Sequence, residues 1–390
     1  MNRIFSLLLL ILLFNCQVPE NRETLEIEEI DQPTAVRGVW LTNVASDVLT
    51  SREKIAEAVT LLDTLGFNTI FVVTWNKAAT MYRSQVMDSL FNQPIDPVYG
   101  ERDPLQEIIE EAHALDIKVF AWFEFGFSSG FKSNGGLIPD KFPQWASRDQ
   151  QGNIAEKNGF EWMNALHPEV QEFMTALVLE LVENYEVDGI QGDDRLPAMP
   201  SNAGYSDFTK NLYADEHGGN YPPEYAKDYE WIQWRAQKLS EYGKALYAKV
   251  KAADPNCIVS MAPSIYPWSE ENYLQDWPVW VNQGFVDLII PQLYRYDIES
   301  YKKLLQEITH WQIDQKNFHK FYPGVLLQVN DYNPDPEFLR QMINANREYG
   351  IHGEVFFFYE GVKKFPELFK DIYQDNIEFP TLTSQENETE

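Results

Sequence analysis

One repeating pattern restricts the folds open to this chain. An amphipathic segment with helical spacing ends in Gly, Asn or Asp, and a short run of β-branched and aromatic residues follows at once. Five clear instances are LGFNTIFVVTW, ALDIKVFAWFEF, YEVDGIQGDD, QGFVDLIIPQLY and YGIHGEVFFFYE. Three further runs, at 36–42, 257–263 and 321–329, bring the predicted strands to eight. Strands that alternate with helices predict parallel βα units in which both faces of the sheet are covered.

Eight such units over residues 36–375 predict a single α/β domain, a (β/α)8 TIM barrel. Pro104, Pro168 and Pro336 fall where first helical turns are needed. Long loops are expected after strands 2, 3 and 4, and such loops leave a barrel at the C-terminal strand ends, where active sites lie. The alternative is an open doubly wound sheet, but no G-x-G-x-x-G follows the first strand.

The first residues have the form of an export signal. Arg3 precedes an apolar run from Ile4 to Phe14, which is too short to span a bilayer comfortably. The sequence Leu13-Phe14-Asn15-Cys16 resembles a bacterial lipobox, which predicts cleavage before Cys16 and a lipid on that cysteine. Ordinary signal cleavage or an uncleaved anchor is the alternative. We expect an exported chain, lipid-anchored at a bacterial membrane and facing the periplasm or the cell surface.

The remaining boundaries follow from composition. The predicted order is a signal peptide at 1–15, an acidic tether at 16–35, the barrel at 36–375 and a polar tail at 376–390. The formal net charge is −29 and the acidic excess is spread along the chain. Such a surface repels nucleic acid and anionic lipid head groups, so we expect membrane contact through the lipid and no nucleic-acid partner. Nothing in the sequence implies a protein partner.

Carboxyl groups gather at the predicted C-terminal strand ends. The fourth strand, in VDGIQGDDR, ends in Asp193 and Asp194. Side chains alternate along a strand, so an inward Asp193 leaves Asp194 on the rim. The third and eighth strands end near Glu124 and Glu360. Other residues at this end that could contact a ligand are Trp40, Trp75, Trp122, Arg195, Gln292 and Tyr294.

Glycoside hydrolysis needs two carboxyl groups, one to protonate the leaving oxygen and one to act as nucleophile or base. Carboxylates that share a partly dry site push their pKa values apart, and tryptophan faces offer flat apolar surfaces to sugar rings. Simpler roles are also open. Asp193 or Asp194 would then cap a turn or pair with Arg195, the two glutamates would form ion pairs inside the rim, and Trp75 and Trp122 would fill the core.

Other chemistries lack their motifs. The six histidines form no H-x-H or H-E-x-x-H pattern and none ends a strand, so we expect no metal. The chain has no G-x-S-x-G elbow and no phosphate-binding glycine loop. We therefore expect no cofactor.

At these residues the chain resembles the glycosyl-hydrolase-like family 10 proteins, predicted barrel glycosidases of bacterial envelopes. The segments RGVWLTNVASDVL, GFNTIFVVTWN, DPLQEIIEEAHALDIKVFAWFEFGF, VDGIQGDDR, IIPQLYRYD and GEVFFFYE match the family pattern in order, over about residues 36–372. The resemblance implies a (β/α)8 fold and glycan hydrolysis, which for some relatives acts on peptidoglycan stripped of its peptides. The family's acidic pair carries over to Asp193 and Asp194, and its further site positions to Glu124, Tyr294 and Glu360. Arg195 stands where relatives commonly have an aromatic residue or histidine.

Together these features predict a glycoside hydrolase that acts on a polysaccharide. Asp194 and Asp193 would lie at the reacting centre, with Glu124 or Glu360 as the second catalytic acid. Strand seven ends in Gln328, so the glutamate arrangement of xylanases is missing. A transglycosylase would use the same carboxylates. The alternative from another class is a glycan-binding envelope lipoprotein without catalysis.

Overall fold

The computed structural model describes residues 34–133, 136–374 and 377–382. The predicted signal peptide, Cys16 and nearly all of the acidic tether lie outside these residues. In the described part of the chain, no helix has both the length and the apolar character needed to cross a membrane.

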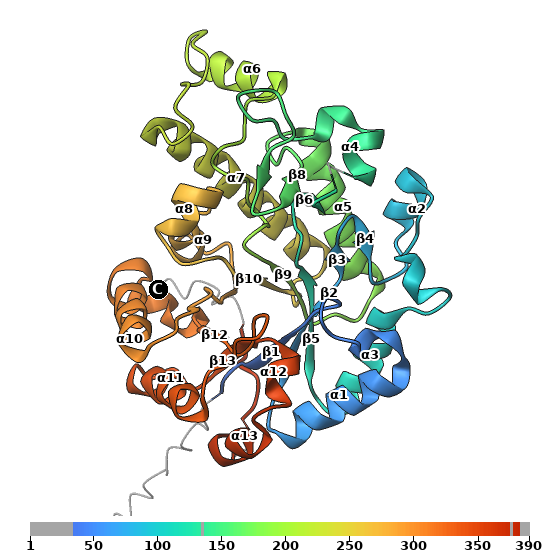
Figure 1. Ribbon diagram of the computed structural model, residues 1–390, viewed down its shortest axis with the longest axis vertical. Helices are drawn as coiled ribbons and strands as arrows, with labels where there is room; N and C mark the ends of the chain where they lie inside the picture. Colours follow the sequence, from blue (N-terminus) through green and yellow to red (C-terminus); the bar gives the residue numbers. More distant parts are fainter. Residues whose placement is uncertain (1–33, 134–135, 375–376, 383–390) are drawn as a thin grey trace, which may run out of the picture. The chain divides into compact units, whose positions relative to one another are not determined.

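Eight parallel strands form the centre of the fold (Figure 1). They are β1 (Arg37–Leu41), β2 (Thr69–Val73), β5 (Lys118–Phe123), β9 (Gly189–Gly192), β10 (Ile258–Met261), β11 (Leu288–Ile289), β12 (Gly324–Leu326) and β13 (Glu354–Phe357). The strand order in the sheet is β11-β10-β9-β5-β2-β1-β13-β12, and each neighbouring pair is parallel. Each of the eight predicted strand segments contains one of these strands, so the predicted parallel α/β sheet is confirmed.

The sheet is curled, so that strands distant in its order meet. The Trp40 indole on β1 donates a hydrogen bond of 2.6 Å to Gln191 Oε1 on β9, although β2 and β5 lie between these strands. At the edges, Tyr322 N donates to Ile289 O at 3.1 Å and Leu293 N donates to Gly324 O at 2.9 Å. These bonds join the β11 and β12 ends of the sheet. The curl therefore brings side chains from several strands to one axis.

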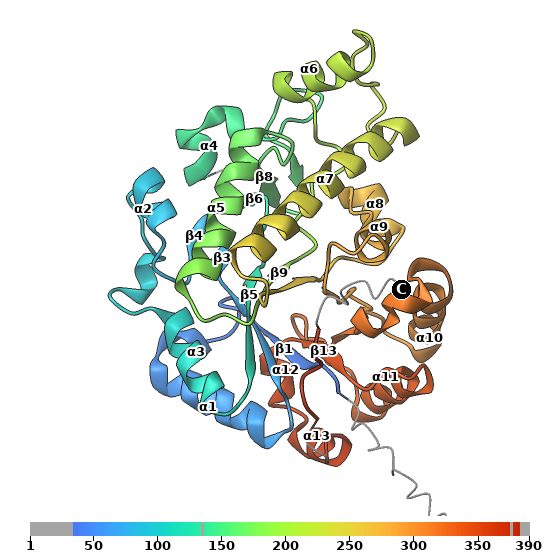
Figure 2. The same ribbon diagram turned by 180° about the vertical axis from the view of Figure 1, so that it is seen from behind.

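Helices lie on the outer side of the sheet (Figures 1 and 2). They are α1 (Arg52–Thr64), α3 (Pro104–His113), α5 (Pro168–Asn184), α7 (Tyr229–Ala253), α9 (Trp277–Asn282), α10 (Ile298–Glu307), α11 (Pro336–Glu348) and α13 (Pro366–Ile372). Two short helices, α8 (Trp268–Tyr273) and α12 (Tyr359–Val362), belong to the connections that follow β10 and β13. Pro104, Pro168 and Pro336 each occupy a first helical turn, as predicted. The missing proline N–H would have no helical partner at that position, so proline is tolerated there.

The connections that follow β2, β5 and β9 contain secondary structure of their own. The first holds the β3 (Trp75–Asn76) and β4 (Ala79–Thr80) hairpin and α2 (Gln85–Phe91), and the third holds α6 (Asp207–Glu216). The second holds α4 (Leu137–Lys141) and an antiparallel sheet of β6 (Ser128–Phe131), β8 (Phe160–Trp162) and β7 (Glu156–Lys157). All three leave the C-terminal ends of their strands.

The chain returns to the N-terminal strand ends after α13. Ala35 N donates to Glu378 O at 3.0 Å, and Asn68 Nδ2 donates to Ile377 O at 3.1 Å. The Phe379 ring lies 6.0 Å from that of Phe120 on β5. The apolar side chains at 377, 379 and 382, within the segment expected as a polar tail, are partly buried against the core.

Candidate active site

The acidic pair directly follows β9. The Asp193 side chain is 4% exposed, and that of Asp194 is 20% exposed. Asp193 Oδ1 accepts hydrogen bonds from Asp194 N at 2.6 Å and from Gln292 Nε2 at 2.8 Å. Gln275 Nε2 donates to the Asp193 main-chain oxygen at 3.0 Å. Asp193 is thus fixed from three sides, whereas Asp194 keeps access to solvent.

Arg195 connects the acidic residues of neighbouring strands. Its Nη2 lies 3.3 Å from Asp193 Oδ2, and its Nε donates to the Glu124 main-chain oxygen at 2.7 Å. Its Nη1 lies 2.9 Å from Asp194 Oδ1, in an orientation that makes an ion pair without hydrogen-bond geometry. The guanidinium also lies 4.6 Å from the centre of the Phe160 ring. Arg195 is therefore a largely buried cation shared by the acids.

Glu124 follows β5, next to β9 in the sheet. Its Oε2 accepts hydrogen bonds from Thr42 Oγ1 at 3.2 Å and from Asn76 Nδ2 at 2.7 Å. Both hydrogen bonds to this carboxyl group from described residues end on Oε2, which leaves Oε1 for a ligand. Burial raises the pKa of Glu124 above its ordinary value, against the opposing charge of Arg195. A carboxyl group in this setting retains its proton at higher pH than an exposed glutamate.

The same environment raises the pKa values of Asp193 and Tyr294. Burial, and then the charge of Asp194, raises the pKa of Asp193 well above its ordinary value. Burial, and then the charges of Asp193 and Asp194, also raises the pKa of the Tyr294 phenol, which follows β11. The Tyr294 ring lies 5.6 Å from that of Phe357 on β13. A neutral phenol close to the acids can donate a hydrogen bond to a sugar hydroxyl.

Glu360 is held by different partners, in the first turn of α12 after β13. Ser46 Oγ donates to Glu360 Oε1 at 2.8 Å, and Lys363 pairs with Oε2. This is the ion-pair alternative considered from the sequence. The contacts of Arg195 bring Glu124, and not Glu360, together with the acidic pair.

The three tryptophans expected to bind substrate are buried. Trp40 is 1% exposed between the strands, and Trp122 lies beside it with 6.4 Å between ring centres. Trp75 donates to Gly126 O at 2.9 Å and packs 5.8 Å from the Phe173 ring of α5. None of these three indole rings is open to a sugar, so the burial of Trp75 and Trp122 favours the core-filling alternative.

Residues that the sequence did not indicate lie around the pair. Burial and then Asp194 raise the pKa of Tyr273, at the end of α8, to about 12. Its hydroxyl accepts a hydrogen bond of 3.0 Å from Asn158 Nδ2, in the turn between β7 and β8. Lys157 Nζ, 4.6 Å from the Tyr273 ring centre, donates to Asn272 O at 2.8 Å. No spacing or motif marks these residues, because two separate connections bring them together.

Across the described ranges, no group of three or more His, Cys, Asp or Glu side chains is arranged to hold a metal ion. The described site offers buried and half-buried carboxyl groups, the Arg195 guanidinium and the phenols of Tyr273 and Tyr294.

A curled parallel sheet with carboxyl groups at the C-terminal ends of its strands is the arrangement of barrel glycosidases. The comparison with known families agrees with this class. The chain belongs to the glycosyl hydrolase-like 10 family, whose model matches residues 35–329. The family resemblance noted from the sequence is thereby confirmed.

Two relatives are similar over most of the chain. Glycosyl hydrolase DigH of Escherichia coli (strain K12) is 23% identical over 309 residues, which cover 70% of this chain and 66% of that protein. The chain thus spans just under two thirds of the length of this relative. Glycosyl hydrolase YngK of Bacillus subtilis (strain 168) is 23% identical over 399 residues, which cover 90% of this chain and 73% of the relative.

Solved structures show the same fold at low identity. The PgaB (BpsB) glycoside hydrolase domain from Bordetella bronchiseptica has a TM-score of 0.66 at 12% identity and covers 89% of this chain and 100% of that domain. Alpha-L-fucosidase isoenzyme 2 from Paenibacillus thiaminolyticus has a TM-score of 0.63 at 16% identity and covers 87% of this chain and 49% of that one. Family and fold together support glycan hydrolysis.

Proposed function

We propose that this chain is a glycoside hydrolase that cleaves glycosidic bonds in a polysaccharide. The proposed scaffold is a closed (β/α)8 barrel, with the long connections after β2, β5 and β9 bordering the substrate. One observation carries the proposal: Arg195 contacts both carboxylates of the acidic pair and the main-chain oxygen of Glu124, and the Glu124 carboxyl group lies near enough for the charges of Arg195 and Asp194 to act on its pKa. A general acid and a second carboxylate can therefore meet one glycosidic bond.

Glu124 is the proposed general acid. Burial raises its pKa, and its Oε1 is open to a ligand, so it can give a proton to the leaving oxygen as the bond to the anomeric carbon breaks. Asp194 is the proposed second catalytic carboxylate, acting as nucleophile or as the base that activates water. Its ion pair with Arg195 orients the carboxylate towards the site. Water supplies the hydroxyl of the new reducing end. If Asp194 is the nucleophile, Glu124 takes the proton of this water; if Asp194 is the base, Asp194 takes it, and exchange with solvent then restores both groups.

Asp193 is proposed as a positioning residue. It accepts the Asp194 main-chain N–H and the Gln292 amide on the same oxygen, which fixes the start of the segment that carries Asp194. Tyr294 and Gln292 are proposed to contact sugar hydroxyls from the β11 side.

The proposed substrate is the peptide-free glycan strand of peptidoglycan. The family resemblance supports it. We also propose that Cys16 carries a lipid, which would hold the chain at the bacterial envelope, where peptidoglycan lies. Replacement of Cys16 by Ser should then move the chain from the membrane fraction to the soluble fraction, and an unchanged distribution would contradict the anchor.

The test uses the purified chain and peptide-free glycan strands, with other polysaccharides in parallel. Reducing ends are measured over time, and the retention of glycan by the immobilised chain is measured separately. We expect the release of reducing ends. Retention without such release would identify a non-catalytic glycan-binding protein and overturn the proposed hydrolase.

A further inference from the structure

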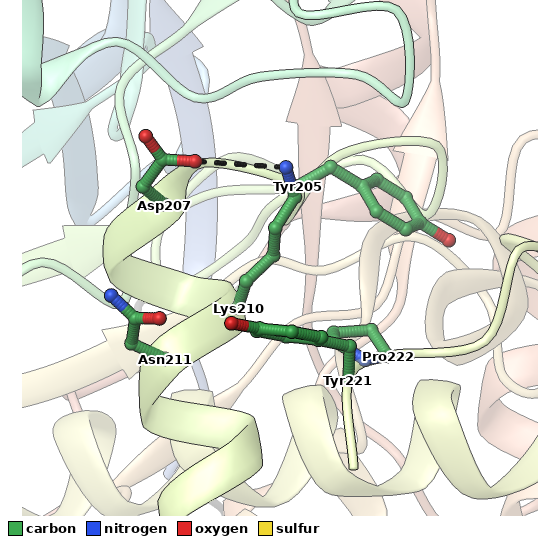
Figure 3. A pocket seen from close by; sticks show the side chains of 6 residues that line it. All are labelled: Tyr205, Asp207, Lys210, Asn211, Tyr221 and Pro222. Atoms are coloured by element: carbon green, nitrogen blue, oxygen red, sulfur yellow. Dashed lines mark ion pairs between the residues drawn. The ribbon is translucent and has the colours of Figure 1, made fainter. Parts of the chain in front are cut away.

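A cavity of about 580 Å³ lies beside α6, apart from the acidic cluster. Figure 3 shows Asp207, Lys210 and Asn211 projecting from α6, with the rings of Tyr205 and Tyr221 supplied by the segments on either side of the helix. Pro222 completes its lining. None of these residues belongs to the cluster around Arg195. The cavity is therefore a separate place on the same connection that begins with Asp193.

The cavity offers a sugar an apolar surface for its ring and polar groups for its hydroxyls. Tyr221 is 66% exposed and lines the cavity, so most of its side chain is available as an apolar surface for a sugar ring. Lys210 and Asp207 form an exposed ion pair of 3.7 Å, and a pair of this kind is weak enough to exchange its hydrogen bonds with a ligand. Asn211 adds an amide that can donate and accept.

The frame of this cavity is fixed before any ligand binds. The Tyr205 hydroxyl donates to Pro223 O at 3.0 Å and so holds the segment next to Tyr221. The buried Asn164 amide donates to Ser206 Oγ at 3.1 Å and to Thr209 Oγ1 at 3.0 Å, which fixes the start of α6 against the preceding connection. A prearranged surface loses little conformational freedom on binding, which favours affinity for a ligand that makes few contacts.

A second cavity of about 380 Å³ continues from the first. The two share Tyr205, Asp207 and Lys210, and the second extends past Arg148 and Phe208. A surface that is continuous over two cavities suits a chain of linked sugar rings better than a single small molecule. Its lining includes the cations Lys210 and Arg148, so the carboxylates of a peptide-free glycan strand meet positive charge here, within an otherwise acidic surface.

We infer that this surface, lined by Tyr205, Asp207, Lys210, Asn211 and Tyr221, is a second glycan-binding site. It binds a stretch of the polysaccharide distant from the bond being cleaved and keeps the polymer close to the acidic cluster. The inference rests on the proposed function for the identity of the polymer. A tethered polymer returns to the catalytic site at a raised effective concentration, so the second site lowers KM for long strands and leaves short fragments unaffected.

The test compares long peptide-free glycan strands with a short soluble oligosaccharide prepared from them, using the full chain. Tyr221→Ala should weaken retention of the strands by about three- to tenfold, the loss expected for one aromatic contact. Tyr221→Phe keeps the ring and should retain most of the binding. Tyr229→Ala is the matched control, because Tyr229 is also exposed but does not line either cavity.

Two readouts separate this inference from the proposed function. In Tyr221→Ala we expect KM for the strands to rise while turnover of the oligosaccharide stays at the native level. Retention unchanged by Tyr221→Ala would overturn the second site even if hydrolysis is observed. Equal losses on strands and oligosaccharide would also overturn it, since Tyr221 would then act on the catalytic site. Failure of the native chain to release reducing ends, with retention that still depends on Tyr221, would contradict the hydrolase alone.

Discussion

Arg195 Nη1 lies 2.9 Å from Asp194 Oδ1, while Nε of the same side chain donates to the main chain of Glu124. This one residue therefore joins the ends of β5 and β9 and supplies the positive charge nearest to the proposed catalytic groups. Its Nε and Nη2 already donate to protein acceptors, so the substrate contact predicted from the sequence would use the remaining N–H groups.

Removal of the Arg195 charge should change the pH dependence of catalysis. The guanidinium lowers the pKa values of Glu124 and Asp193, so Arg195→Gln should raise both. The high-pH limb of the kcat/KM profile, set by loss of the general-acid proton, should move to higher pH, and kcat/KM should fall by about 10²-fold or more. Arg195→Lys should keep part of the original profile. If Arg195→Gln raises KM but leaves the high-pH limb of the kcat/KM profile in place, Arg195 contacts the substrate instead.

The two candidate acids can be separated by matched amide substitutions. Glu124→Gln should lower kcat by about 10²- to 10⁴-fold, because glutamine cannot give a proton to the leaving oxygen. Glu360→Gln should have an effect of less than about tenfold, since Glu360 is paired with Lys363 and lies outside the contacts of Arg195. Initial rates of reducing-end release on one glycan compare the two variants. The reverse order would transfer the role of the acid to Glu360.

Burial of Asp193 should be visible in the pH dependence of stability. A carboxyl group with a raised native pKa binds its proton more tightly in the folded chain, so its contribution is full below the ordinary value of 3.8 and is lost as pH rises through the native pKa. Asp193→Asn removes this dependence. The stability of the variant relative to the native chain should therefore improve as the pH is raised from about 4 to about 8. Denaturant unfolding at several pH values measures the difference, and a relative stability that falls with pH would contradict the assignment.

Trp40 should act on stability more than on glycan contact. Trp40→Phe removes the indole N–H that Gln191 Oε1 accepts and leaves space between the strands, so the free energy of unfolding should fall by about 1–3 kcal/mol. Denaturant unfolding gives this value, and KM for short glycans should change little. Unchanged stability with a large rise in KM would mean that a sugar reaches the Trp40 ring.

The strands were predictable because their signal is local. A run such as IKVFAWF, preceded by a helix end, carries the period and the residue types of a buried parallel strand without reference to distant parts of the chain. The direction of strand four then places Asp193 and Asp194 at the C-terminal edge of the sheet. Most of the framework and the location of the acids follow from these facts alone.

The partners of the acids were not predictable in the same way. From the sequence, Arg195 is either a substrate contact or an ion-pair partner of the acidic residues. Only the folded chain brings its guanidinium between the ends of β5 and β9. The sequence left Glu124 and Glu360 as equal candidates for the second acid. The structure separates them, because Glu360 pairs with Lys363 whereas the Glu124 side chain accepts from Thr42 and Asn76. These contacts depend on side-chain rotamers that no sequence pattern encodes. The burial of Trp75 depends likewise on Phe173 of α5, far away in the sequence.

The most direct test of the account is the turnover of peptide-free glycan strands by Asp194→Asn. The substitution keeps the size of the side chain and removes the carboxylate proposed to act as nucleophile or base. Reducing-end release should fall by on the order of 10³-fold, while retention of the strands by the immobilised variant persists. Turnover by Asp194→Asn within about twofold of the native rate would contradict the central claim.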